Sequence, residues 1–189
     1  MLEYAIEFYN NNTFLFYFIL VITVIIEGPI TILALSLISS SLEIGFFTIL
    51  IFAFIGDFFG DLLHYFVGRF FKNKLIKRDF SIVKKVEEKL IGHSLMDKLI
   101  VIKYTPPITS LGLLYLGYIK TNFISYSKNG AILSAFSAIF ITSIGYNFGY
   151  LFKDKNDFTY LLIGLFLSFA VFYFLLKLFT KYLIKKIYE

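Results

Sequence analysis

The chain has 189 residues, of which 58% are apolar and 21% aromatic, and its formal net charge is +5. A soluble domain of this length does not need so much apolar surface, so we expect the excess to face lipid. Continuous apolar runs, without period-two alternation, exclude a transmembrane β-barrel. The absence of cysteine excludes disulfides, thiolate catalysis and zinc–thiolate sites. The sequence therefore predicts a single-domain, all-α polytopic membrane protein.

The first apolar run, residues 13–41, is long enough to cross a bilayer but is interrupted near its middle. The stretch before it, residues 1–12, lacks the basic start of a cleavable signal peptide, so we expect the run to be retained. The interruption consists of Glu27, Gly28 and Pro29. Proline removes a backbone donor and biases the preceding residue away from helix. The run therefore predicts a re-entrant hairpin, with one kinked spanning helix as the alternative.

Residues 44–67 form an uninterrupted apolar run that predicts a spanning helix, although the run carries Asp57 and Asp61. Four residues apart, these carboxylates project from one helix face. Gly56 and Gly60 leave room beside that face for a close neighbour or a water-filled cavity. Because an ionised carboxylate inside a bilayer is costly, we expect both to be paired, hydrated or protonated. They are therefore candidates for proton coupling.

The alternative to proton coupling is a structural ion pair. Arg69 follows Asp61 at the end of this run, and Lys103 lies in the next interrupted run. Either cation could neutralise Asp61, since a buried charge is tolerated when it is paired.

The polar segment 69–98 contains nine Lys and Arg residues against four Asp and Glu residues, which predicts a cytoplasmic location. Apolar residues on one helical face favour an amphipathic helix on the cytoplasmic leaflet, with a solvated loop as the alternative. Those residues are Val83, Val86, Leu90 and Ile91. The basic residues alternate with apolar ones, which points to a lipid surface and not to nucleic acid. We expect His93 to be a solvated surface residue.

The second interrupted run, residues 99–119, is broken by Lys103 and by Pro106 and Pro107. For the same reasons as the first run, it predicts a re-entrant hairpin, with one kinked spanning helix as the alternative. Lys103 is the cation at this break and is a candidate transport residue.

Residues 130–152 and 158–180 are two further apolar runs of spanning length. The tail from Lys177 onward holds four lysines against one glutamate, which predicts a cytoplasmic C-terminus. Helix 130–152 then runs outward, so we expect residues 120–128 to be cytoplasmic. Run 99–119 thus begins and ends on the cytoplasmic side.

The predicted fold is an inverted repeat of two re-entrant helical hairpins, each followed by a spanning helix, which is typical of secondary transporters. A cytoplasmic amphipathic helix and a C-terminal spanning helix complete the single membrane domain. Its parts are residues 13–68, 69–98, 99–152 and 158–184. The segments "YFVGRFF" and "YNFGYLF", which end the two predicted repeat helices, share tyrosine, glycine and phenylalanine at matching offsets.

Residues 13–152 resemble the DedA family, also called the SNARE-associated Golgi protein or VTT-domain family. The family signature Gly-Asp-x-x-x-Tyr-x-x-Gly-Arg is matched by Gly60, Asp61, Tyr65, Gly68 and Arg69. Further matches are the Glu-Gly-Pro start at residues 27–29, the Gly56-Asp57 variant, Lys103 opening the second hairpin and Gly117 closing it. The second hairpin departs from the pattern, because Thr109 and Leu113 stand where many members have an arginine and a proline.

The resemblance implies a membrane transporter, specifically a flippase or scramblase of phospholipid or polyprenyl phosphate in a bacterial-type plasma membrane, with protons as a coupling partner. It implies no catalytic residue, cofactor or metal. The transport and proton-coupling candidates are Glu27, Asp57, Asp61, Arg69 and Lys103. The structural motif residues are Gly28, Pro29, Gly56, Gly60, Tyr65, Gly68, Pro106, Pro107 and Gly117. A second copy of the chain is a further candidate partner. The other functions left open are a non-transporting assembly or homeostasis factor and, less favoured, an intramembrane lipid-modifying enzyme.

Overall fold

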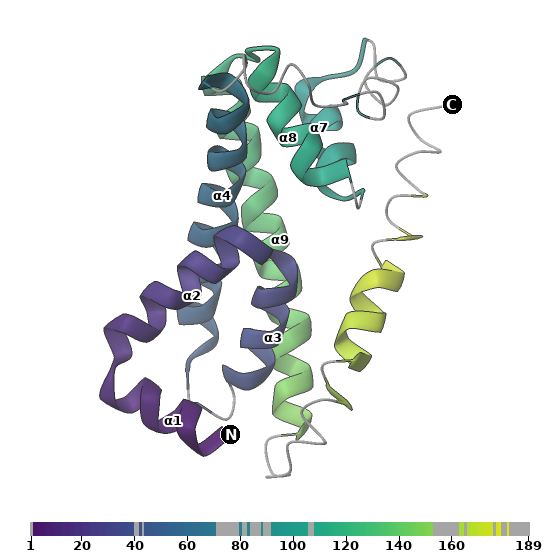
Figure 1. Ribbon diagram of the computed structural model, residues 1–189. Helices are drawn as coiled ribbons and strands as arrows, with labels where there is room; N and C mark the ends of the chain where they lie inside the picture. Colours follow the sequence, from purple (N-terminus) through teal and green to yellow (C-terminus); the bar gives the residue numbers. More distant parts are fainter. Residues whose placement is uncertain are drawn as a thin grey trace. The chain divides into compact units, whose positions relative to one another are not determined.

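The secondary-structure elements of the described chain are all helices (Figure 1). The computed structural model describes residues 2–39, 42, 44–70, 80, 83, 88, 92–105, 108–152, 163, 164, 166–175, 177, 178 and 181. The helices are α1 Leu2–Asn11, α2 Thr13–Glu27, α3 Pro29–Ser39, α4 Phe46–Phe70, α7 Leu95–Lys103, α8 Ile108–Tyr118 and α9 Phe123–Phe152, and Phe166–Leu175 is helical as well. They belong to two compact units. The first unit is Met1–Gly60 with Ser134–Phe174, and the second is Asp61–Leu133 with Leu175–Glu189.

In the first unit, the interrupted run 13–41 is two helices, α2 and α3, and not one rod (Figure 1). The break is at Gly28, whose φ of 59° lies in the left-handed region that favours glycine. Its N–H donates to the carbonyl of Val24 at 2.7 Å, which ends α2. Pro29 begins α3, where its missing N–H costs nothing because the first helical residue has no intrahelical acceptor. The helix break that the sequence predicts is therefore present.

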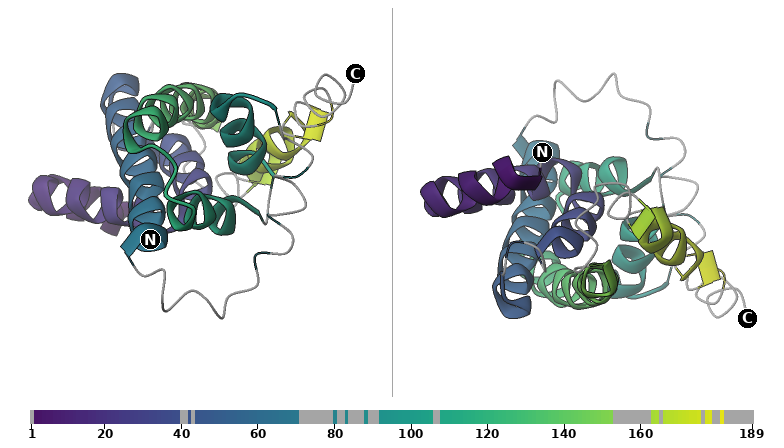
Figure 2. Two further views of the ribbon diagram at one scale, coloured as in Figure 1. Left: turned by 90° about the horizontal axis from the view of Figure 1, so that it is seen from above. Right: turned by 90° about the horizontal axis from the view of Figure 1, so that it is seen from below.

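A further helix, α1, precedes this pair and was not predicted. Asn12 separates α1 from α2, and viewed from above and below the two helices overlie one another, so the bend between them lies in the plane of Figure 1 (Figure 2). Tyr9 of α1 packs edge-on against Phe16 of α2, with ring centroids 5.1 Å apart. Aromatic packing thus holds α1, a helix of 10 residues, against α2.

The end of α2 packs against the middle of α4 at two glycines. A Cβ atom on Gly56 would lie 2.5 Å from a methyl carbon of Val24, and one on Gly60 would lie 3.2 Å from the carbonyl oxygen of Ile25. A side chain at either position would push the helices apart. The close neighbour that these glycines predict is therefore α2.

In the second unit, the interrupted run 99–119 is also two helices, α7 and α8, which lie side by side (Figure 1). α7 begins with a capping box, in which the Ser94 hydroxyl accepts from the N–H of Asp97 and the Asp97 carboxylate accepts from the N–H of Ser94. It ends at Lys103, before the two prolines; Pro106 and Pro107 themselves lie outside the described residues.

Among the described helices, α4 and α9 are long and apolar enough to cross a membrane. α4 extends three residues beyond the predicted end at residue 67, and α9 begins at Phe123, seven residues before the predicted start. The earlier start follows from Asn122, whose side-chain oxygen accepts from the N–H of Ser125 at 3.0 Å and so caps the helix. Residues 123–128 therefore belong to α9.

Two predicted parts of the chain are only partly described. The C-terminal span 158–184 is helical over Phe166–Leu175, and most of its remaining residues lie outside the described set. In segment 69–98 the predicted amphipathic helix also lies largely outside it, including Val86, Leu90 and Ile91. Val83 is described and is buried with Phe80 against Leu114 and Tyr115.

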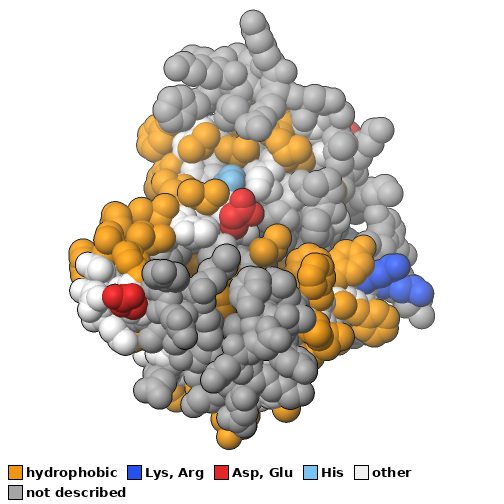
Figure 3. All heavy atoms as spheres, turned by 60° about the horizontal axis from the view of Figure 1, so that its bottom comes forward, with side chains coloured by type: hydrophobic (Ala, Val, Ile, Leu, Met, Phe, Trp, Pro, Cys, Tyr) orange, Lys and Arg blue, Asp and Glu red, His pale blue; other side chains and the backbone are white. Residues whose placement is uncertain are grey.

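The described surface is rich in large apolar side chains. Phe14 is 85% exposed, and Phe47 and Ile124 are 75% exposed each. On the face shown in Figure 3, apolar side chains predominate among those described, with few charged groups between them. Large apolar side chains exposed in such number are typical of a membrane or protein contact.

Candidate functional site

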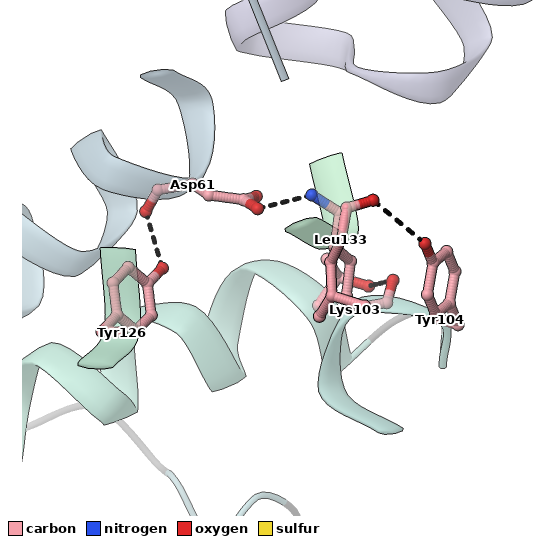
Figure 4. A network of polar contacts seen from close by, with 6 residues as sticks. Asp61, Lys103, Tyr104, Tyr126 and Leu133 are labelled. Carbon is pink, nitrogen blue, oxygen red and sulfur yellow. Dashed lines mark hydrogen bonds and ion pairs between the residues drawn. The ribbon is translucent and has the colours of Figure 1, made fainter. Parts of the chain in front are cut away.

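The candidate site is a buried ion pair in the second unit. The ammonium of Lys103, the last residue of α7, lies 2.5 Å from a carboxylate oxygen of Asp61 on α4 (Figure 4). The side chains of Lys103 and Asp61 are only 7% and 11% exposed. Removing either partner from such a pair leaves an uncompensated buried charge, which is strongly destabilising. The two charges are therefore mutually dependent.

Tyrosines hold the main chain on either side of the pair. The Tyr126 hydroxyl donates to the backbone carbonyl of Asp61 at 2.9 Å, and the Tyr104 hydroxyl donates to the carbonyl of Leu133 at 3.4 Å (Figure 4). Tyr126 also stacks on Tyr65, with ring centroids 4.4 Å apart. The three tyrosines and Leu133 belong to one buried apolar cluster, and the hydrogen bond from Tyr126 links this cluster to Asp61.

A hydroxyl also holds the backbone of the lysine. Thr109, the second residue of α8, donates through Oγ1 to the carbonyl of Lys103 at 3.1 Å. The ion pair is thus anchored from three helices: α4 through Asp61, α7 through Lys103 and α8 through Thr109.

Arg69 is placed differently from Lys103. Its guanidinium donates to the hydroxyl of Tyr65 at 2.5 Å and lies 5.8 Å from the centre of that ring. The Tyr65 hydroxyl in turn donates to the carbonyl of Thr121 at 2.5 Å. Of the two cations considered as a partner for Asp61, the structure pairs Lys103 with it, and Arg69 supports Tyr65.

Two motif glycines allow α4 and α8 to touch backbone to backbone. A Cβ atom on Gly68 would overlap the carbonyl oxygen of Leu114, and one on Gly117 would overlap that of Tyr65. Gly117 lies inside α8, and the turn after this helix contains Lys120 at a φ of 56°. Gly117 therefore makes a close helix contact one residue before the end of α8.

The remaining predicted residues lie in the first unit. Glu27 is the last residue of α2 and its side chain is exposed. Asp57 is 7% exposed and precedes Asp61 by one turn of α4. Gly28 and Pro29 form the α2–α3 break already described.

Sequence reasoning missed Tyr126 and Tyr104, and it named Thr109 only as a departure from the family pattern. The two tyrosines carry no sequence signal, because their partners are 65 and 29 residues away. A signal for Thr109 does exist: two prolines deprive the end of α7 of donors, which favours a hydroxyl group nearby.

Comparisons of the chain with protein-family models, with curated proteins and with solved structures find no match. Across the residues described, no three acidic or histidine side chains are grouped so as to hold a metal ion.

Proposed function

We propose that the chain is a DedA-like integral membrane transporter that moves a lipid or lipid phosphate across the bilayer, coupled to protons. The observation that carries this proposal is the buried Asp61–Lys103 pair beside a helix break, in a chain with an extensive apolar surface. Ionisable residues at membrane depth are rare and mark substrate or proton pathways.

Helix length supports the re-entrant arrangement. α2 has 15 residues and α3 and α8 have 11 each. At 1.5 Å per residue they extend roughly 22 and 16 Å, against a hydrocarbon core about 30 Å thick. In our proposal each of the pairs α2–α3 and α7–α8 enters the membrane and returns to the same side, in opposite orientations. Segment 69–98 and the C-terminus are cytoplasmic, and the membrane is a bacterial-type plasma membrane.

The chemistry of the pair suggests how lipid and proton movement are coupled. In the resting state the Lys103 ammonium and the Asp61 carboxylate neutralise each other. A lipid phosphate can replace the carboxylate as the partner of Lys103, provided that Asp61 takes up a proton and is not left as an isolated buried charge. When the phosphate leaves, Asp61 releases the proton and pairs with Lys103 again. In this scheme Glu27 and Asp57 are further proton-accepting groups.

The test is movement of fluorescent phospholipid and polyprenyl phosphate in proteoliposomes, with and without a pH gradient. Glu27→Gln is expected to insert normally and to lose lipid movement. Asp61→Asn is expected to insert and to lose lipid movement as well, and its stability is measured alongside because it removes the partner of Lys103. Glu7→Gln is the matched control, since Glu7 is an exposed carboxylate of α1. If Asp61→Asn and Glu27→Gln both moved lipid as the wild-type chain does, the proposed mechanism would be wrong.

The close packing around the pair favours a second candidate, a non-transporting assembly or homeostasis factor. The backbone contacts at Gly68 and Gly117 hold α4 and α8 closely together, and such a rigid helix pair could serve an assembly role without any titrating group. This candidate predicts that carboxylate substitutions leave function intact wherever the protein still folds. An intramembrane enzyme remains the least favoured reading, and we propose no catalytic residue.

A further inference from the structure

The last carbonyl groups of α7 lack the backbone N–H donors that a continuing helix would provide, because two prolines follow the helix. In an α-helix each carbonyl accepts from the N–H four residues later, so Ile102 and Lys103 would require donors at residues 106 and 107. Both of those residues are prolines, which have no N–H. Continuing the helix therefore cannot satisfy the carbonyl of Lys103, the residue that carries the buried ammonium.

Thr109 supplies the missing donor. Its hydroxyl bonds to the Lys103 carbonyl at 3.1 Å and replaces the N–H that Pro107 lacks. One further bond closes the same turn, from the N–H of Ile108 to the carbonyl of Thr105 at 2.8 Å. Thr109 thus links the start of α8 to the main chain of Lys103.

The other hydroxyl near this break does not share the role. Thr105 lies between Lys103 and Thr109 in the sequence, and its Oγ1 is buried without a hydrogen-bond partner among the described residues. The two threonines therefore form a matched pair, in which one hydroxyl bonds to the lysine backbone and the other has no such contact.

We propose that Thr109 is a positioning residue for the Asp61–Lys103 ion pair. Its hydroxyl fixes the backbone of Lys103 and thereby sets where the ammonium meets the carboxylate. A buried pair offsets its desolvation cost only when its geometry is good, so a small displacement of the lysine backbone weakens the pair. The consequence for lipid movement rests on the proposed function, but the positioning itself does not.

The experiment is a double-mutant cycle on the full chain in detergent micelles, with reversible unfolding in SDS as the readout. Thr109→Val keeps the shape of the side chain and removes the hydroxyl, and we expect it to lower the folding equilibrium constant about tenfold. Thr105→Val, the matched control, is expected not to lower it, because replacing a buried hydroxyl that has no described partner with a methyl group is neutral or stabilising. Thr109→Ser keeps the hydroxyl and should restore most of the loss.

The cycle is then repeated in an Asp61→Asn, Lys103→Met background, which has no ion pair. If Thr109 positions the pair, Thr109→Val should cost only about threefold there, because neighbouring groups that act together are not additive. An equal loss in both backgrounds would show a helix cap and no positioning role, and would overturn the proposal. A Thr109→Ser chain as unstable as Thr109→Val would also overturn it.

If Thr109→Val does not yield folded protein, Thr109→Ser and Thr109→Ala are compared in the same two backgrounds, with the same criterion. Lipid movement is measured separately in proteoliposomes. A wild-type chain that moves no lipid contradicts the proposed function and leaves the outcome of the cycle unaffected.

Discussion

The hydroxyl of Tyr126 donates to the backbone carbonyl of Asp61, at 2.9 Å, while the carboxylate of Asp61 pairs with Lys103. Main chain and side chain of one residue are therefore held by different partners. Tyr126 fixes where this part of α4 stands against α9, and Lys103 neutralises the charge.

Tyr126→Phe keeps the ring stacked on Tyr65 and removes only this hydrogen bond. We expect the free energy of unfolding to fall by about 1 kcal/mol, the usual net value of one buried hydrogen bond. Unfolding in SDS measures the change, and Tyr150→Phe is the control because Tyr150 is 69% exposed. An unchanged stability for Tyr126→Phe would mean that ring packing alone holds α4.

The ion pair predicts an asymmetry between single and double substitutions. Lys103→Met removes the ammonium that neutralises the buried Asp61 carboxylate, which should destabilise the chain by about 3–5 kcal/mol at neutral pH. Adding Asp61→Asn removes that charge, and most of the lost stability should return. The free energies of unfolding of the two single variants and the double variant give the coupling. Additive losses would contradict a direct interaction between these residues.

Sequence reasoning identified the elements whose signals are local. The break at Gly28 and Pro29 follows from backbone chemistry alone, and the continuous apolar run 44–67 corresponds to most of α4. The predicted start of α9 was seven residues too late because it was placed where the apolar run begins. The helix itself begins earlier, at the cap that Asn122 provides.

The site could be predicted only as a set of alternatives. Charge in an apolar run shows that Asp61 needs a partner, but the sequence allows either Arg69 or Lys103 to supply it. Tertiary packing selects between them: Arg69 donates a hydrogen bond to the Tyr65 hydroxyl, and Lys103, at the end of α7, forms the ion pair with Asp61. Contacts such as the one from Tyr126 span 65 residues and have no periodic signature.

Replacing glycine with alanine should have opposite effects on stability at Gly117, which contacts α4, and at Gly130, which does not. Gly117→Ala would drive a methyl group into the backbone of α4, and overpacking of this kind costs typically 1–3 kcal/mol. Gly130→Ala is the control, because Gly130 lies inside α9 with nothing within 4 Å of an added Cβ. Alanine there should stabilise the chain by up to about 1 kcal/mol through helix propensity. Thermal unfolding in detergent distinguishes the two, and equal effects would contradict the backbone contact.

The absence of cysteine from the chain allows a direct test of the re-entrant arrangement. Asn12 and Gly45 flank the α2–α3 pair and are exposed, so a cysteine at either position can react with a membrane-impermeant maleimide. If the pair enters the membrane and returns, Asn12→Cys and Gly45→Cys should both be labelled from outside intact cells. Lys181→Cys, in the basic tail, should be labelled only after the membrane is opened. Because α2 and α3 together have 26 helical residues, a kinked helix could also span the bilayer, and it would place Asn12 and Gly45 on opposite sides. That pattern would remove the inverted repeat on which the proposed lipid transport depends.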